Sequence, residues 1–229
     1  MSRIARIVIP GCPHHVTQRG NHRQRVFFSD ADYEIYLKLL RKYYLKYKVG
    51  MAGHALIPNH THQILIPELE NSLAKGVGLL HNDFSRWHHL QRNLSGHLWQ
   101  NRFYSSPLDE DHFWLALRYA ELNPVRAGLV KYAWDWPWSS ARAHVTGIDN
   151  TGLINMDLWR VRFSGDKWKE FLQEGVNSKD EVERIRLATR IGRPLGSDDF
   201  IRRLEAITGR SLFPKKRGPK IGSKRKRSG

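Results

Sequence analysis

The sequence is poor in cysteine, in long apolar runs and in acidic residues. Cys12 is its single cysteine, so a disulfide within the chain is impossible and thiolates cannot build a metal cluster. No apolar run approaches the ~20 residues that a membrane-spanning helix needs. The apolar part of residues 1–10 is also too short for a secretory signal. We therefore expect a cytoplasmic protein.

The excess of positive charge is the strongest compositional signal. Lys and Arg number 38 against 22 Asp and Glu, which gives a formal charge of +16 and a pI near 10.2. A charge of this size indicates a polyanionic partner, most often nucleic acid. Eight Trp, eight Tyr and nine Phe also offer flat surfaces for unpaired bases, although most aromatic residues belong to the core. We expect DNA as the partner and, in a bacterial cell, association with the nucleoid.

Part of this charge lies in a basic tail, residues 214–229, which contains eight Lys and Arg and no acid. Removing these eight charges from +16 leaves +8 on the rest of the chain, so the body is basic as well. Runs of like charge repel one another and are usually disordered until they meet phosphate. We expect the tail to bind DNA through residues that include Lys215, Lys216 and Arg217.

Hydrophobic periodicity divides the first 147 residues into strands and helices. The joint at residues 58–59 is too short for a crossover, so the strands on either side of it must be antiparallel. The elements follow one another as strand, helix, strand, strand, helix, strand and helix. This order predicts an α+β domain with one mostly antiparallel sheet and helices packed on it. We expect strands at 14–19, 49–57, 60–66 and 99–108, and helices from Ser29 to near Gly50, at 72–92 and at 112–122.

The remainder of the chain reads as a smaller helical region. Residues 147–152 resemble a linker, and residues 153–213 contain helical patterns near 167–173, 179–190 and 198–208. Ser178 and Ser197 are suitable N-caps for the last two. This region is either a small DNA-reading module or a helical cap on the first domain, and the sequence leaves both interpretations open.

Two histidines stand two residues apart within a β-like run. Side chains alternate across a strand, so His60 and His62 must point to the same face. Two neutral imidazoles on one face can bind a divalent cation. A His-x-His pair alone is weak support, because exposed strand histidines arise by chance in a chain with twelve His.

A helix further along the chain carries the groups that would complete this site. Tyr119 and Asn123 are four residues apart and so share a helix face, with Pro124 near the helix end. If that face meets the histidines, the site contains a phenol and an amide oxygen as third metal ligand. Oxygen ligands favour Mg²⁺ or Mn²⁺ over Zn²⁺. Alternatively, Tyr119 is a core aromatic residue and Asn123 caps the helix.

Five sequence segments together form a recognisable set: residues 15–21 (HVTQRGN), 58–62 (PNHTH), 99–104 (WQNRFY), 119–130 (YAELNPVRAGLV) and 136–140 (WPWSS). The set resembles segments of a known family, the single-tyrosine HUH transposases, and within it the REP-associated tyrosine transposases. The segments follow the family's order and span about residues 11–145, which makes the set far more specific than the histidine pair alone. One departure is Thr61, where the family usually has an apolar residue.

The resemblance implies a ferredoxin-like sheet in a catalytic domain, residues 1–147. It also implies metal bound by His60 and His62, Asn123 in the place of a helix-borne polar ligand, and Tyr119 as nucleophile. The activity implied is metal-dependent cleavage of single-stranded DNA through a 5′-phosphotyrosyl intermediate, followed by strand transfer. The family's targets are hairpins of repetitive extragenic palindromes.

Two other functions remain open: a DNA-binding regulator of the same fold without chemistry, and a metal-dependent nuclease that uses water. Tyr104 is a rival nucleophile, although it is more typical of sheet packing. His14, His15 and His54 are expected to be structural or DNA-facing, and Glu121 and Asp109 to be solvated or to assist the metal or a proton. The protein could be a monomer or a homodimer. Expected phosphate contacts in the body are Arg19, Arg23, Arg102 and Arg126.

Overall fold

A four-stranded antiparallel sheet forms the centre of the molecule in a computed structural model, which describes residues 6–175 and 179–213. The strand order is β2-β3-β1-β4, and helices connect β1 to β2 and β3 to β4. This is the expected α+β, ferredoxin-like arrangement. The strands are β1 (His14–Arg19), β2 (Val49–Ile57), β3 (His60–Pro67) and β4 (Tyr104–Pro107).

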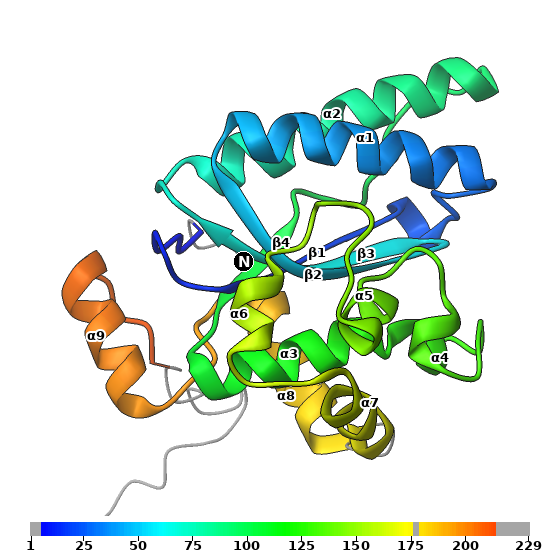
Figure 1. The fold of residues 1–229 in the computed structure, drawn as a ribbon. Helices are drawn as coiled ribbons and strands as arrows, with labels where there is room; N and C mark the ends of the chain where they lie inside the picture. Colours follow the sequence, from blue (N-terminus) through cyan, green and yellow to red (C-terminus); the bar gives the residue numbers. More distant parts are fainter. Residues whose placement is uncertain (1–5, 176–178, 214–229) are drawn as a thin grey trace, which may run out of the picture.

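Helices α1 (Asp30–Lys46) and α2 (Ser72–Arg92) cover one face of the sheet (Figure 1). Their apolar residues recur at three- and four-residue intervals, so that Tyr36 and Leu40 face Leu80 and Phe84 in one hydrophobic cluster. This face is a largely apolar core that also encloses buried hydrogen bonds from Gln63 to the Tyr36 hydroxyl and from the Tyr44 hydroxyl to Gln63.

Helix α3 (Glu110–Glu121) lies against the opposite face of the sheet (Figure 1). Asp109 begins it by accepting a hydrogen bond from the His112 amide at 3.0 Å. Gly53 of β2 allows the helix to approach closely, because a Cβ atom there would collide with the Leu117 side chain. Short helices follow: α4 (Asn123–Arg126), α5 (Ala141–Thr146) and α6 (Met156–Arg160).

The last three helices are α7 (Gly165–Glu174), α8 (Lys179–Ile191) and α9 (Asp198–Thr208). Trp168 of α7 and Ile185 of α8 belong to the same hydrophobic cluster as Leu117 of α3. The boundary after residue 147 stays a prediction, while the helices on both sides of it share one core. Helix α9 instead packs on the N-terminal segment, where Phe200 and Leu204 meet Ile7 and Ile9.

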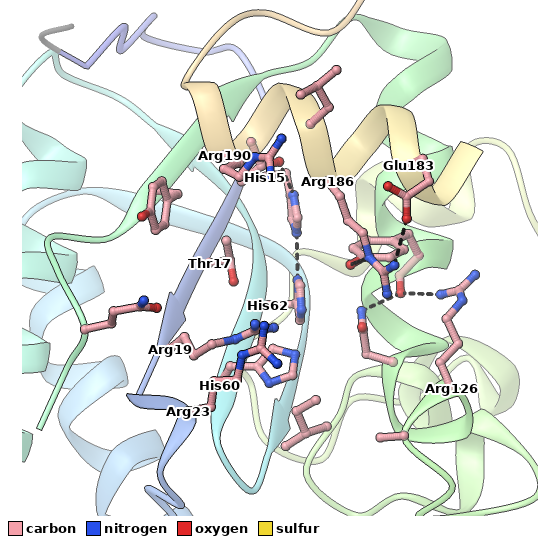
Figure 2. Close-up of a pocket in the computed structure, with 18 residues that line it drawn as sticks. His15, Thr17, Arg19, Arg23, His60, His62, Arg126, Glu183, Arg186 and Arg190 are labelled. Atoms are coloured by element: carbon pink, nitrogen blue, oxygen red, sulfur yellow. Dashed lines mark hydrogen bonds and ion pairs between the residues drawn. The ribbon is translucent and has the colours of Figure 1, made fainter. Parts of the chain in front are cut away.

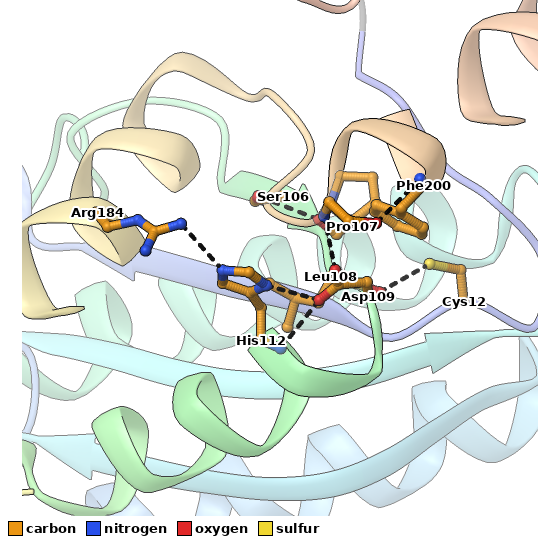
Figure 3. A network of polar contacts seen from close by, with 9 residues as sticks. Cys12, Ser106, Pro107, Leu108, Asp109, His112, Arg184 and Phe200 are labelled. Atoms are coloured by element: carbon orange, nitrogen blue, oxygen red, sulfur yellow. Dashed lines mark hydrogen bonds and ion pairs between the residues drawn. The ribbon is translucent and has the colours of Figure 1, made fainter. Parts of the chain in front are cut away.

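The connection between α8 and α9 is held on the end of β4 (Figure 3). The Leu195 amide donates to the Pro107 carbonyl at 2.9 Å, and the Asp109 amide donates to the Leu195 carbonyl at 3.2 Å. Asp109 also accepts from the Ser197 amide at 2.7 Å. Asp109 is therefore a structural capping residue that joins α3 to the C-terminal helices.

Most expected elements agree with the structure, and the differences are local. The strand expected at 99–108 is shorter in the structure, where β4 covers only residues 104–107. Trp99 forms a single bridge to Gly20, and its indole N–H donates to the His81 carbonyl of α2. Residues 147–152 form a turn ordered by Asp149, whose carboxylate accepts the Thr151, Leu153 and Ile154 amides. Helices α4, α5 and α6 were not expected.

Of the two expected helix caps, Ser197 is confirmed by its hydrogen bond from the Phe200 amide, and Ser178 lies outside the described residues. Across the described ranges, every helix is too short or too polar to traverse a lipid bilayer.

A buried polar network joins α3 to α5 and α7. Glu121 is fully buried, and its carboxylate accepts from the Ser140 hydroxyl at 2.5 Å and the Trp168 indole at 2.8 Å. His144 Nδ1 lies 2.5 Å from the same carboxylate. Glu121 is thus placed in the core beneath the C-terminal helices, and neither solvation nor metal binding describes its environment.

We expect Glu121→Ala to lower the free energy of unfolding by about 2–6 kcal/mol, because the Trp168 indole and the His144 imidazole would remain buried without an acceptor, at about 1–3 kcal/mol each. The Ser140 hydroxyl would retain the His54 carbonyl as its acceptor. Denaturant unfolding measures the loss, with Glu170→Ala on the exposed side of α7 as control, for which a change within about 0.5 kcal/mol is expected. Equal effects for both variants would contradict a stabilising role for this network.

Candidate functional site

A pocket of about 1030 Å³ lies between the sheet and helices α3, α4 and α8 (Figure 2). Its walls combine imidazole, phenol, amide and guanidinium groups, and Glu183 is the single acid among the described residues that line it. Such a pocket has room for a nucleotide and the charge to attract one. The lining includes His15, Thr17, Arg19, Arg23, His60, His62, Gln100, Tyr104, Tyr119, Asn123, Arg126, Glu183, Arg186, Leu187, Thr189 and Arg190.

The register of β1 and β3 brings the histidines together. Thr17 pairs with His62 and Arg19 pairs with His60, so these side chains share one face of the sheet with His15. The His60 and His62 ring centroids are 5.0 Å apart. The expectation that both imidazoles face the same way is confirmed.

Tyr119 extends from α3 toward the histidines. Its ring lies edge-on to His62, with centroids 5.3 Å apart, and edge-on to His15 at 5.6 Å. The sequence left open whether two protomers share a site, and in this structure the phenol and both imidazoles of one chain already lie within one pocket.

The free nitrogen atoms of the two histidines suit a cation. His60 Nδ1 lies 2.6 Å from the Asn59 side-chain oxygen, which can only accept, so the Nε2 lone pair of a neutral His60 is free. His62 Nδ1 lies 2.9 Å from His15 Nε2, whereas His62 Nε2 is buried without a hydrogen-bond partner among the described residues. An unpaired buried nitrogen beside a second imidazole fits a metal ligand.

These two imidazoles need additional ligands to hold an ion. Within residues 6–175 and 179–213, no group of three or more His, Cys, Asp or Glu side chains is placed to bind a metal. A cation here would therefore complete its coordination with amide, phosphate or water oxygens, which is typical of Mg²⁺ and Mn²⁺.

Burial keeps these rings neutral. Burial first, and then Arg19 and Arg186, lower the pKa of His60 to about 3, and burial lowers the pKa of His15 to about 3. The pKa of His62 also lies well below its ordinary value, through burial first and then through the neighbouring rings. Each ring thus carries one N–H and one lone pair at pH 7.

Asn123 lies in the pocket wall and also terminates α3. Its side-chain nitrogen donates to the Tyr119 carbonyl at 2.8 Å and to the Ala120 carbonyl at 3.3 Å. The Ala120 carbonyl lacks a helical partner because Pro124 has no N–H. The amide oxygen is not used in this cap, so Asn123 as third ligand stays a prediction beside its capping role.

The expected phosphate-binding residues divide into three groups. Arg19, Arg23 and Arg126 line the pocket, although Arg126 also donates to the Tyr119 carbonyl at 3.1 Å. Arg102 is exposed and lies outside the pocket lining. Lys215, Lys216 and Arg217 lie outside the described residues.

Helix α8 supplies pocket residues that sequence reasoning missed. Arg186 donates from Nε to the Tyr119 hydroxyl at 3.3 Å, and Arg190 and Glu183 stand on the same side of the helix (Figure 2). Thr189 is buried and contacts His15 at 2.7 Å. His15 could have been found from the sequence, because it shares the period-two pattern of β1 with Arg19. Nothing local predicts that α8 covers the sheet.

The other candidate residues have different positions. Tyr104 of β4 also lines the pocket, so it remains a rival nucleophile on position alone. His14 and His54 are buried, and His14 Nδ1 contacts the Cys12 carbonyl at 2.7 Å. Both have the structural environment that was expected of them.

Comparison with known proteins places the chain among transposases. A family model described as "Transposase IS200 like" matches residues 9–123. The structure is similar to that of a REP-associated tyrosine transposase bound to a REP hairpin. The TM-score is 0.53 with 22% sequence identity, over 69% of this chain and 90% of that one. At this identity the likeness shows the fold.

A putative transposase from Deinococcus radiodurans is also similar, with a TM-score of 0.38 and 13% identity. That match covers 56% of this chain and 98% of the other, and at this TM-score it carries no argument. No curated protein matches the sequence.

Proposed function

Because the chain belongs to the IS200-like transposase family, we propose that it cuts single-stranded DNA and transfers the cut strand with Tyr119 as nucleophile. The observation that carries this proposal is the contact between the Tyr119 ring and His62 inside an arginine-lined pocket. Tyr119 is buried and belongs to the same apolar cluster as Leu117. Its ring and hydroxyl also meet two imidazoles and the Arg186 guanidinium, which gives this buried phenol reactive neighbours.

His60 and His62 would hold the divalent cation, with the Asn123 amide oxygen as a third ligand. When bound, Mg²⁺ or Mn²⁺ supplies Lewis-acid polarisation of a non-bridging phosphate oxygen. The neutral imidazoles offer fixed lone pairs, and the outer hydrogen bonds of both rings hold their orientation. Arg19 and Arg126 would position the flanking phosphates.

The Tyr119 oxygen attacks phosphorus, so that a bond forms between them while the bond from phosphorus to the 3′ oxygen breaks. The phenol proton passes to water and the departing 3′ oxygen takes up a proton, leaving a 5′-phosphotyrosyl bond and a free 3′-hydroxyl. The Arg186 N–H already donates to the Tyr119 oxygen and stabilises it as its proton leaves. Attack by a 3′-hydroxyl on the phosphotyrosyl bond then rejoins the strand.

The proposed substrate is a REP-like hairpin, as in the similar structure bound to a REP hairpin. The pocket lining is rich in arginine, and the basic tail adds charge for the rest of such a DNA. A protein that acts on chromosomal hairpins would reside in the cytoplasm with the nucleoid.

We expect Tyr119→Phe to abolish the covalent protein–DNA complex formed with labelled hairpin DNA and Mn²⁺, because phenylalanine has no nucleophilic oxygen. Denaturing gels measure the complex, which should also be lost in His60→Ala. Tyr104→Phe is the matched control, since it removes the other phenol in the same pocket.

The same gels separate the competing functions. A water-using nuclease gives cut DNA without a complex, and a regulator gives neither. A complex that persists in Tyr119→Phe and disappears in Tyr104→Phe would transfer the nucleophile to Tyr104.

We expect Arg186→Gln to slow formation of the covalent complex by about tenfold. Loss of one buried donor to a reacting oxygen slows a reaction by ~10²–10³, and the effect should be smaller here because 52% of the Arg186 side chain is exposed. Single-turnover rates at saturating DNA measure it. Arg184→Gln is the control for net charge, because Arg184 is on the same helix and faces His112; equal slowing in both variants would exclude a specific role for Arg186.

A further inference from the structure

A continuous chain of hydrogen bonds runs from α8 to the pocket (Figure 2). The Thr189 hydroxyl donates to the Ile185 carbonyl at 2.8 Å, and His15 Nδ1 lies 2.7 Å from the Thr189 oxygen. His15 Nε2 in turn lies 2.9 Å from His62 Nδ1. Thr189, His15 and His62 are 2%, 1% and 4% exposed, so water does not compete for these bonds.

The direction of the donors in this chain follows from its first member. A carbonyl only accepts, so the Thr189 hydrogen points to Ile185 and the Thr189 oxygen accepts from His15 Nδ1–H. A neutral His15 has no second N–H, so its Nε2 accepts from His62 Nδ1–H. His62 Nε2 is then left with a bare lone pair.

We propose that Thr189 and His15 are positioning residues that set the tautomer of His62, so that its Nε2 presents a lone pair, not an N–H, to the pocket. The consequence for metal binding rests on the proposed function, because Nε2 is the His62 atom that would bind the cation. The tautomer itself is a property of the metal-free protein.

The opposite direction of donation is less favourable in this structure. If the Thr189 hydroxyl donated to His15, then His62 would carry its N–H on Nε2. That atom is buried and has no acceptor among the described residues. The reversed chain would thus bury an unpaired N–H and would also give up the hydrogen bond from the Thr189 hydroxyl to the Ile185 carbonyl, which favours the direction proposed.

Helix α8 is held at both ends, which keeps Thr189 against His15. Near its start, Glu181 forms an ion pair with Arg118 of α3 at 2.5 Å, and Arg118 is largely buried. Just beyond its end, the Ser106 hydroxyl donates to the Arg193 carbonyl at 2.6 Å. The state of His62 on β3 therefore depends on a helix more than a hundred residues later in the chain.

We expect Thr189→Val to move the His62 proton from Nδ1 to Nε2. Valine has nearly the same shape but offers no oxygen to His15 Nδ1–H, so His15 would carry its proton on Nε2 and donate to His62. The ¹⁵N chemical shifts of the His62 ring in metal-free protein report the tautomer. Mn²⁺ titration should show affinity weakened by about 10- to 100-fold, as for other outer-sphere partners of metal-binding histidines.

Two further variants separate this effect from a structural one. Thr189→Ser retains the hydroxyl and should restore both the ¹⁵N shifts and Mn²⁺ affinity. Thr208→Val removes the equivalent hydroxyl bond within α9, from Thr208 to the Leu204 carbonyl, and should change neither measurement.

The wild-type ¹⁵N spectrum decides the proposal even if Thr189→Val fails to fold: a proton on His62 Nε2 overturns it. An unchanged tautomer and unchanged Mn²⁺ affinity in folded Thr189→Val overturn it as well. If wild-type protein shows the expected tautomer but binds no Mn²⁺, the metal-dependent function fails while the control of His62 by Thr189 and His15 is supported.

Discussion

The structure depends on one constraint: the face of β1 and β3 that carries His15, His60 and His62 is polar and yet is covered by helices. Polar groups taken out of water must be hydrogen-bonded or must await a ligand. Asn59 satisfies His60, and His15 together with Thr189 satisfies His62. The Nε2 lone pairs of His60 and His62 remain unpaired among the described residues and are directed at the pocket. The covering helices thus leave this face with a small number of free lone pairs in fixed positions.

The two faces of the sheet have different roles. Under α1 and α2 the side chains form a largely apolar cluster that supplies stability, and its buried polar side chains are hydrogen-bonded to one another, as Gln63 is to Tyr36. Under α3, α7 and α8 apolar packing surrounds two buried polar groups, the Glu121 network and the histidine chain. These two groups lie near opposite sides of α3, since Glu121 meets Trp168 while Tyr119 meets His62. A single helix therefore separates a structural polar network from the proposed reactive one.

Local patterns were sufficient to predict the sheet, the direction of the histidine pair and the helix that carries Tyr119. Strand alternation places His60 beside His62 whatever the rest of the chain does, and apolar periodicity defines α1 and α2. The contribution of α8 could not be predicted. Arg186 and Arg190 look like ordinary solvated residues of an amphipathic helix, and their approach to Tyr119 arises from tertiary packing. The role of Asn123 was ambiguous, because its amide nitrogen can cap the helix while its amide oxygen can bind a metal.

The family match ends at residue 123, whereas α8 begins at residue 179. During synthesis, the ribosome releases both histidines and Tyr119 well before the helix that orders them. Domains generally fold as units, and α3 shares one core with α7 and α8, so the cover over the histidines forms only when α8 has been synthesised. A chain that ends before α8 would therefore hold the imidazoles and the phenol without the hydrogen bonds that Thr189 and Arg186 supply.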